Sequence, residues 1–251
     1  MARQKAILTT RQDFEQSELA SNKSRAYIYF DGVNLPTDIS QVVDNDEILE
    51  FRNGTPTVTN GIIGTGNATI FNKAMLAWRS WQIPAHTSVS VSTWVKFAPD
   101  DLASGKWRIL ATNRGFGFTD FGIHLGVLGG NINVRVFGTG GSGQFYVPDT
   151  SPFYALQPNV WYHMGVYHNA AQTGNNTHLV INGTIAHSAR VVTGSFATRE
   201  QSYSVGDMVN LSGVSNGNSG LTSSVVFGET FFAYDSNALT TTELINMYER
   251  V

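Results

Sequence analysis

The stretch that decides the fold reads WYHMGVYHN at residues 161–169 and THLVINGTIAH at residues 177–187. Both segments are rich in aromatic and β-branched residues, which favour strands. The second segment is interrupted by Asn182-Gly183, and a type I′ turn needs two consecutive residues that tolerate positive φ. The sequence therefore predicts consecutive β-strands, of which the last two form a hairpin around Asn182-Gly183.

Alternation of apolar and polar residues continues on both sides of that stretch. Residues 89–97 read VSVSTWVKF, and further strands are predicted at 108–112, 120–126, 132–137 and 225–232. The last of these is either a closing strand pair or one bent strand. Period-two alternation is typical of half-buried strands, and the Gly, Pro, Asn and Asp residues between the segments predict turns. Short strands with this spacing predict an all-β sandwich.

Three blocks of sequence, in this order, resemble the laminin-G-like jelly rolls of the concanavalin A-like lectin and glucanase superfamily. The matching residues are Trp94-Val95-Lys96 at the end of an early strand, Trp161-Tyr162-His163 with Val180-Ile181-Asn182-Gly183 in the centre, and Ala238-Leu239-Thr240-Thr241-Thr242-Glu243 after the last strand. The resemblance implies coverage from about Tyr27 to the C-terminus. It also implies that Trp94 and Trp161 lie in the core, and that His163 is a hydrogen-bonded structural residue.

The expected fold is a two-sheet antiparallel jelly-roll sandwich in a single domain at residues 27–251, with an N-terminal arm at residues 1–26 and a C-terminal capping helix. Residues 11–20, capped by Thr10, are predicted to form a short helix whose Phe14 and Leu19 are too widely spaced for an apolar stripe. The arm is therefore expected to dock on a partner chain or on its own sandwich, and a partly ordered terminus is the alternative.

Two further segments differ from a plain run of strands. Residues 33–61 depart from the family pattern and are interpreted as an inserted hairpin or an extended loop. In the final helix, Thr240 and Glu243 have the spacing of a capping box, and Leu244, Met247 and Tyr248 share one side. We expect that side to pack against the sandwich.

The composition indicates a polar surface that carries little charge. Charged residues make up 14% of the 251 residues, against about 25% in an average soluble protein. Such a surface suits contact with hydroxyl-rich ligands or with neighbouring copies, because little charge has to be desolvated, and we expect a homo-oligomer. The net charge of −3 and the lack of a Lys/Arg cluster predict no binding to nucleic acid.

The sequence also bears on location. The first ten residues lack the apolar run of a signal peptide, and no later segment is apolar enough to span a bilayer, so no membrane insertion is expected. The protein is expected to fold in a host cytoplasm and to become part of a virion, by analogy with phage fibre and decoration proteins. Its partners would be other virion proteins and copies of itself.

No catalytic constellation is present in the sequence. A β-glucanase of this superfamily would carry Glu-x-Asp-x-x-Glu on one strand, and the nearest approach, Asp44, Asp46, Glu47 and Glu50, has the wrong spacing. His163 and His168 are five apart and would face opposite sides of a strand. No Gly-x-Ser-x-Gly motif supplies a nucleophile. We therefore expect no enzyme and name no catalytic residue.

Calcium is the cofactor that the resemblance implies, held at a rim by Asp side chains and backbone carbonyls. The candidate ligands are Asp120, Asp149 and Asp207. None of the three lies in a dense acidic loop, and the alternative is that each carboxylate accepts hydrogen bonds from a turn backbone.

Aromatic side chains are the candidates for carbohydrate binding, since their faces stack on pyranose rings. Trp78 and Trp81 are candidates because two indoles three residues apart cannot share one face of a strand, so at least one is expected to be exposed or packed under a loop; core packing is the alternative for either one. Trp107 is the third candidate. Gly138 opens a glycine-rich segment interpreted as a long connection to Pro158, on which Tyr146 and Tyr154 lie.

Three functions follow from these observations. The first is a non-enzymatic virion surface protein, a decoration or fibre component, whose lectin-like domain recognises host-surface glycans. The second is a purely architectural capsid or tail subunit that binds no ligand. The third, which the missing carboxylate motif disfavours, is a polysaccharide hydrolase.

Overall fold

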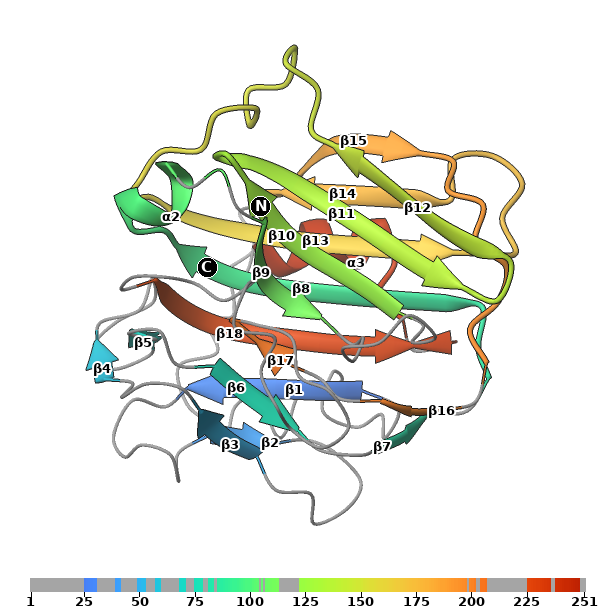
Figure 1. Cartoon of the computed structure of the whole chain (residues 1–251), viewed down its shortest axis with the longest axis horizontal. Coiled ribbons are helices and arrows are strands. Elements are labelled where there is room, and N and C mark those ends of the chain that lie inside the picture. The colour runs from blue at the N-terminus through green and yellow to red at the C-terminus, as the bar shows by residue number, and fades with distance from the viewer. Residues whose placement is uncertain are drawn as a thin grey trace, which may run out of the picture.

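The structure is a computed structural model and forms a two-layered β-sandwich (Figure 1). It describes residues 25–30, 39–41, 49–52, 57–59, 68–70, 75–78, 81–83, 85–103, 105, 107–112, 122–197, 199–201, 204–206, 225–235 and 238–248. All the strand pairs within these ranges are antiparallel, which confirms the predicted jelly-roll class.

The larger sheet has nine strands in the described residues. Its main path runs β15 (Thr184–Ala189), β14 (Thr177–Ile181), β13 (Trp161–Asn169), β8 (Ser88–Lys96), β18 (Val226–Tyr234), β1 (Arg25–Phe30) and β2 (Ile39–Gln41). Off this path, β5 (Ala68–Ile70) pairs with β18 and with β4 (Thr57–Thr59). The segment predicted at 225–232 is thus one strand, whose register shifts between Phe227 and Thr230.

The second sheet has seven strands in the same part of the chain. They follow the order β12 (Gly141–Tyr146), β11 (Asn131–Gly138), β10 (Gly122–Leu128), β9 (Trp107–Thr112), β17 (Ser204–Val205), β6 (Met75–Trp78) and β3 (Leu49–Arg52). A separate pair joins β7 (Trp81–Ile83) to β16 (Arg199–Gln201). In Figure 1, strands β9 to β12 lie in front of β8, β13 and β14.

The core lies between the two sheets and is built by alternation. On β8, Val89, Val91 and Val95 are buried against residues of the opposite sheet such as Val134 and Val136. Such burial contributes about 1.5–3 kcal/mol for each large aliphatic or aromatic side chain. The alternate residues of each strand therefore point away from the core, onto the outer faces of the sandwich.

The turns that the sequence predicts are present. Asn182 and Gly183 have φ values of 46° and 71°, as a type I′ turn between β14 and β15 requires. The glycine-rich turn at Gly129-Gly130 joins β10 to β11 with φ values of 58° and 77°. Both hairpins are confirmed, although β10 begins at Gly122 and ends at Leu128, two residues later than predicted.

The long connection predicted from Gly138 to Pro158 is partly wrong. Gly141–Tyr146 forms strand β12, which pairs with β11 from Gly138↔Gly141 to Asn133↔Tyr146. A strand fits here because Phe145 is buried in the core and Gly143 leaves room for Val191, whose Cγ1 would clash with a Cβ at that position. The irregular connection begins only at Val147.

The serine side chains of β8 form hydrogen bonds on the outer side of the nine-stranded sheet. Ser88 Oγ donates to the carbonyl of Asp235 at 2.8 Å, and Ser90 Oγ accepts from the amide of Leu239 at 2.8 Å. Ser92 Oγ lies 2.7 Å from Nε2 of His163. The alternating Val-Ser pattern therefore reflects valines in the core and serines that hold the C-terminal segment and a buried histidine.

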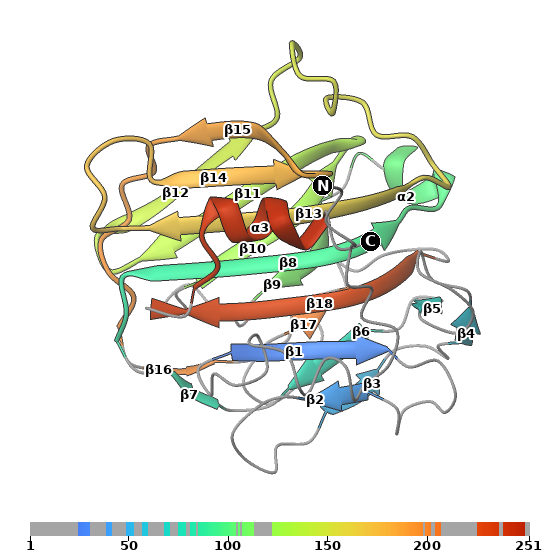
Figure 2. The ribbon, with the colours of Figure 1, turned by 180° about the vertical axis from the view of Figure 1, so that it is seen from behind.

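Helix α3 (Thr241–Tyr248) covers the outer face of the nine-stranded sheet, over β13 and β14, as Figure 2 shows. Its start is the predicted capping box: the amide of Glu243 donates to Thr240 Oγ1 at 3.3 Å, and the amide of Thr240 donates to Glu243 Oε2 at 2.8 Å. Leu244 and Met247 are buried, and Tyr248 is half-buried. The predicted capping helix is confirmed.

Several expectations fall outside the described residues. Those residues begin at Arg25, the start of β1, so the arm and its helix after Thr10 are not covered and the boundary at residue 26 stays a prediction. Of the segment at 33–61, only the strand residues of β2, β3 and β4 are described. No helix in the described part of the chain has the length and hydrophobicity needed to cross a membrane.

Candidate carbohydrate-binding site

The outward side of β11 and β12 carries a set of polar and aromatic side chains. On β11, Ile132, Val134 and Val136 point into the core, so Asn133, Arg135 and Phe137 point outward. The register sets each beside a residue of β12: Asn133↔Tyr146, Arg135↔Gln144 and Phe137↔Ser142. We call this surface, completed by Trp107 of β9, the open sheet face. No described strand or helix covers it (Figure 1).

The Trp107 ring reaches over Gly126 of β10, where a side chain would meet first the backbone carbonyl of Arg108 and then this indole. A Cβ on Gly126 of β10 would lie 3.0 Å from Cζ2 of Trp107. Arg135 Cζ lies 4.5 Å from the centroid of the Trp107 ring, a cation–π distance. Trp107 is half-buried, and its Nε1 has no hydrogen-bond partner among the described residues.

Asn133 fixes the position of Arg135. The Asn133 side chain is fully buried, and its Nδ2 donates to the carbonyl of Phe145 at 3.1 Å. Its Oδ1 in turn accepts from Nε of Arg135 at 3.3 Å. The guanidinium is therefore held on two sides, by an amide and by an indole ring.

A hollow of about 490 Å³ adjoins this arginine. Arg135, Phe137, Ser142, Gly143 and Gln144 line it. Ser142 and Gln144 are exposed, and Phe137 is half-buried with its ring centroid 5.1 Å from that of His124. The hollow thus offers hydroxyl, amide and guanidinium groups around an aromatic surface, within the size range of ligand sites.

Tyr146, predicted as a sugar-binding residue, lies on the same face. Its side chain is 37% exposed. In the sheet, Tyr146 of β12 pairs with Asn133 of β11, and Asn133 pairs in turn with Gly126 of β10, which lies beneath Trp107. Neighbouring strands are about 4.8 Å apart, so Tyr146 stands two strand spacings, about 10 Å, from the strand that underlies the indole. The structure therefore brings together two of the predicted aromatic residues, Trp107 and Tyr146.

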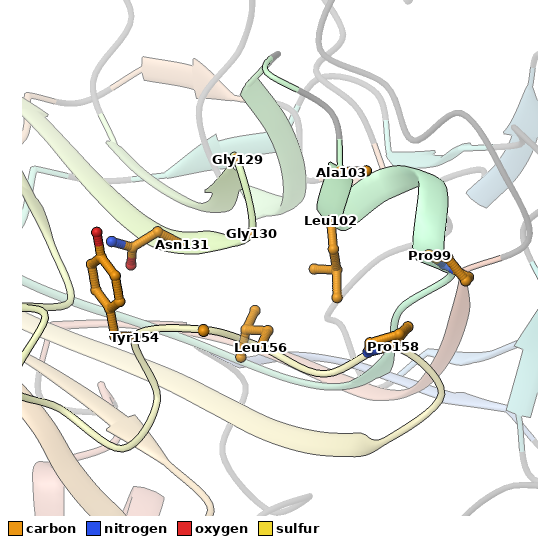
Figure 3. A pocket seen from close by; sticks show the side chains of 10 residues that line it. Pro99, Leu102, Ala103, Gly129, Gly130, Asn131, Tyr154, Leu156 and Pro158 are labelled. Atoms are coloured by element: carbon orange, nitrogen blue, oxygen red, sulfur yellow. The ribbon is translucent and has the colours of Figure 1, made fainter.

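Tyr154 belongs to a different place, a rim pocket at one end of the sandwich. Figure 3 shows Tyr154 beside Asn131, with Leu102 of α2 (Pro99–Ala103) opposite Leu156. The pocket measures about 400 Å³. Tyr154 is 44% exposed, and Asn131 Oδ1 is buried with no hydrogen-bond partner among the described residues. The walls are mainly apolar, with one polar end.

The other predicted site residues are placed only in part. Trp78 ends β6 and Trp81 begins β7, and their side chains lie outside what the structure describes, as do Asp120 and Asp207 altogether. Asp149 lies in an exposed turn after β12. Among the described residues, no group of three or more His, Asp or Glu side chains could hold a metal. Calcium stays a prediction.

Two tryptophans differ from the placement that the resemblance implies. Trp94 is buried, but it lies beneath α3, stacked on Tyr248 at 5.7 Å, and not between the sheets. Trp161 is not in the core: it is half-buried on the outer side of β13, with Lys96 Nζ 5.3 Å from its ring centroid. Alternation explains both positions, because their sequence neighbours Val95 and Tyr162 take the core side.

His163 has the structural role that the resemblance implies. It is fully buried on the α3 side of β13, and burial lowers its pKa to about 3. His168 is also fully buried, but on the core side, and burial lowers its pKa to about 4. Both histidines are therefore neutral at pH 7, and neither can reach a ligand on the open sheet face.

Arg135, Asn133, Gln144 and Phe137 were not singled out from the sequence. Arg135 and Asn133 stand in the alternating segment at 132–137, where an isolated arginine resembles any solvent-facing strand residue. Pairing of β11 with β12 is what distinguishes these residues. That pairing could not be predicted, because the glycine-rich sequence of β12 resembles a loop.

A two-sheet sandwich with a polar, aromatic outer face has the architecture of a lectin-like domain. The sequence model of the Concanavalin A-like lectin/glucanases superfamily matches residues 64–221, more than half of the chain, and the chain belongs to that superfamily. A comparison with curated proteins found no match.

Solved structures with similar folds include bacterial toxin binding domains. The receptor binding domain of botulinum neurotoxin D is 16% identical, with a TM-score of 0.62 over 92% of this chain and 53% of that chain. The serotype D ligand binding domain in complex with N-acetylneuraminic acid is 15% identical, with a TM-score of 0.60 over 93% of this chain and 52% of that chain. The binding domain of Paraclostridial Mosquitocidal Protein 1 is 14% identical, with a TM-score of 0.60 over 92% and 52%. This chain spans about half the length of each, and the likeness shows the fold alone.

Proposed function

We propose that this protein is a non-enzymatic glycan-binding domain whose site is the open sheet face. The observation that carries the proposal is the grouping of Trp107 and Tyr146 with Arg135 and Gln144 on one uncovered face. Aromatic faces stack on sugar rings, and amide and guanidinium groups hydrogen-bond to hydroxyls. The described part of this face holds no carboxylate pair that could cleave a glycosidic bond.

The comparisons support a binding role. The superfamily comprises lectins as well as glucanases, and one similar structure is a toxin ligand binding domain in complex with N-acetylneuraminic acid. The weakly charged composition, with 14% charged residues, is suited to hydroxyl-rich ligands.

Tyr146→Ala tests the proposed site. The protein and its variants are incubated with a panel of polysaccharides and host-envelope fractions, and both retention and released reducing ends are measured. We expect retention without release, and for Tyr146→Ala a Kd about tenfold higher, because a stacking surface worth about 1.4 kcal/mol is lost.

Tyr154→Ala is the matched control, since Tyr154 is similarly exposed but lines the rim pocket. Its affinity should equal that of the unaltered protein. If Tyr154→Ala weakens binding and Tyr146→Ala does not, the site is the rim pocket. Retention of no glycan would contradict the proposed function, and released reducing ends would show an enzyme.

We further propose a location for this domain, which is the surface of a virion, where it would be a decoration or fibre component. The low charge favours close packing with other polar subunits, and the same property favours the alternative of a purely architectural subunit. Mass spectrometry and immunogold labelling of purified particles test the location. A labelled particle surface together with no retained glycan would favour the architectural subunit.

A further inference from the structure

We propose that the glycan bound on the open sheet face is acidic, and that the guanidinium of Arg135 binds its carboxylate. This inference rests on the proposed function and names the ligand class that the site selects.

The charge of Arg135 is not neutralised within the described protein. Its contacts there are the Nε hydrogen bond to Asn133 Oδ1 and the stacking on Trp107, and no described carboxylate forms an ion pair with it. An arginine side chain offers five N–H donors, so the donors on its terminal nitrogens are available to a ligand. A half-buried cation with spare donors is suited to an anionic partner.

The guanidinium is also held before any ligand arrives. The carbonyl of Phe145 accepts from Asn133, which is fully buried, and Asn133 accepts from Arg135. The Trp107 ring also restrains the guanidinium, because its centroid lies 4.5 Å from Cζ of Arg135. A fork fixed in this way loses less rotamer entropy on binding, and its flat edge matches the two oxygens of a carboxylate.

The neighbouring residues fit the rest of an acidic sugar. Ser142 and Gln144, both exposed, line the same hollow as Arg135 and supply hydrogen bonds for ring hydroxyls. Phe137 supplies an apolar surface for the C–H face of the ring. A hollow of about 490 Å³ accommodates a monosaccharide unit with its carboxylate directed at the arginine.

Specificity here depends on the local arginine and not on the whole molecule. The net charge is −3, so long-range attraction does not draw an anion to the protein. Acidic ligands must therefore be recognised by direct contact with Arg135, and removal of this one charge should remove the preference.

The test compares matched ligands that differ only in charge. The probes are oligogalacturonate and its methyl ester, together with a sialylated oligosaccharide and the methyl ester of its sialic acid, measured by isothermal titration calorimetry. We expect each acidic form to bind at least about tenfold more tightly than its neutral counterpart. Arg135→Gln should abolish this preference while binding to the neutral forms persists, and Arg135→Lys should retain part of it, because the charge remains but the fork is lost.

Lys96→Gln is the matched control, because Lys96 also lies over an indole, that of Trp161, but on the other sheet. It should leave the preference unchanged, and unaltered thermal unfolding of each variant shows that the fold is intact. Equal binding of acidic and neutral forms would overturn the inference and leave the proposed glycan-binding function standing. Binding of no glycan would overturn both. A preference for a sulfated oligosaccharide over every carboxylate would overturn the choice of carboxylate.

Discussion

Two buried histidines show how single residues shape the stability of this fold. Both ring nitrogens of His168 lie near hydroxyls, Thr177 Oγ1 at 2.7 Å and Thr193 Oγ1 at 3.1 Å. His163 pairs with Ser92 through Nε2, and its Nδ1 is buried with no hydrogen-bond partner among the described residues. Among the described residues no carboxylate stabilises either charged ring, and burial holds each histidine neutral.

Acid should therefore destabilise the protein from about pH 6.5 downward, beginning above the range in which carboxylates titrate. Burial lowers the pKa from 6.5 to about 3 for His163 and to about 4 for His168, so below pH 6.5 the unfolded chain binds protons that the folded chain does not. The free energy of unfolding should fall by roughly 1.4 kcal/mol per pH unit for each histidine between pH 6.5 and about 4, and be flat above pH 7.5. Urea denaturation at a series of pH values measures this slope.

His168→Gln separates this effect from that of other groups. The amide keeps hydrogen-bonding capacity near Thr177 and Thr193 but cannot titrate, so the slope should drop by about half even if the variant is less stable overall. An unchanged slope would show that other groups cause the acid sensitivity.

At the scale of single elements, β8 joins the core to the C-terminal segment. Its valines pack between the sheets, and its serines hydrogen-bond to Asp235, Leu239 and His163. Leu239 leads directly into α3, so the strand sets where the helix begins.

Ser90→Ala should destabilise the protein by about 1–3 kcal/mol, because the buried amide of Leu239 would lose its acceptor. Chemical denaturation measures the change. Ser195→Ala is the control: Ser195 is exposed, and its loss should change stability by less than about 0.5 kcal/mol. Equal effects of the two substitutions would argue against the role assigned to Ser90.

Elements whose signals are local could be predicted from the sequence. The Asn182-Gly183 hairpin and the Thr240-Glu243 capping box each depend on residues within one turn, and both are present. Strand β12 was missed because its first residues, Gly141-Ser142-Gly143, resemble a loop, and what makes them a strand is pairing with β11.

The candidate site was predicted only in part for the same reason. Trp107 and Tyr146 could be named as aromatic residues, but their common face depends on the pairing of four strands. Arg135 could not be recognised as a site residue from its own position, because the evidence for it is its contacts with Trp107 and Asn133. Tyr154, named with the same reasoning, lies in the rim pocket.

The whole molecule has two unlike sides. Helix α3 covers part of the nine-stranded sheet, whereas no described helix covers the seven-stranded sheet (Figures 1 and 2). Contact between copies can therefore occur without blocking the open sheet face.

A homo-oligomer remains our expectation, because 14% charged residues leave little charge to desolvate between copies. Light scattering of the full-length protein and of a form lacking residues 1–26 should show an oligomer for the former. A strict monomer for both would contradict the prediction. Loss of the oligomer only in the shortened form would assign the contact to the arm.

The sheet covered by α3 can be regarded as the back of the domain, and the open sheet face as its front. If copies are fixed to a support by their backs, every front points outward, and one long polymer chain can touch several copies at once. Each further contact then forms at the high effective concentration set by the first, so that millimolar contacts add up to firm attachment. The position of α3, a helix of eight residues, would thus determine whether many weak binding sites can engage one polymer together and give high avidity.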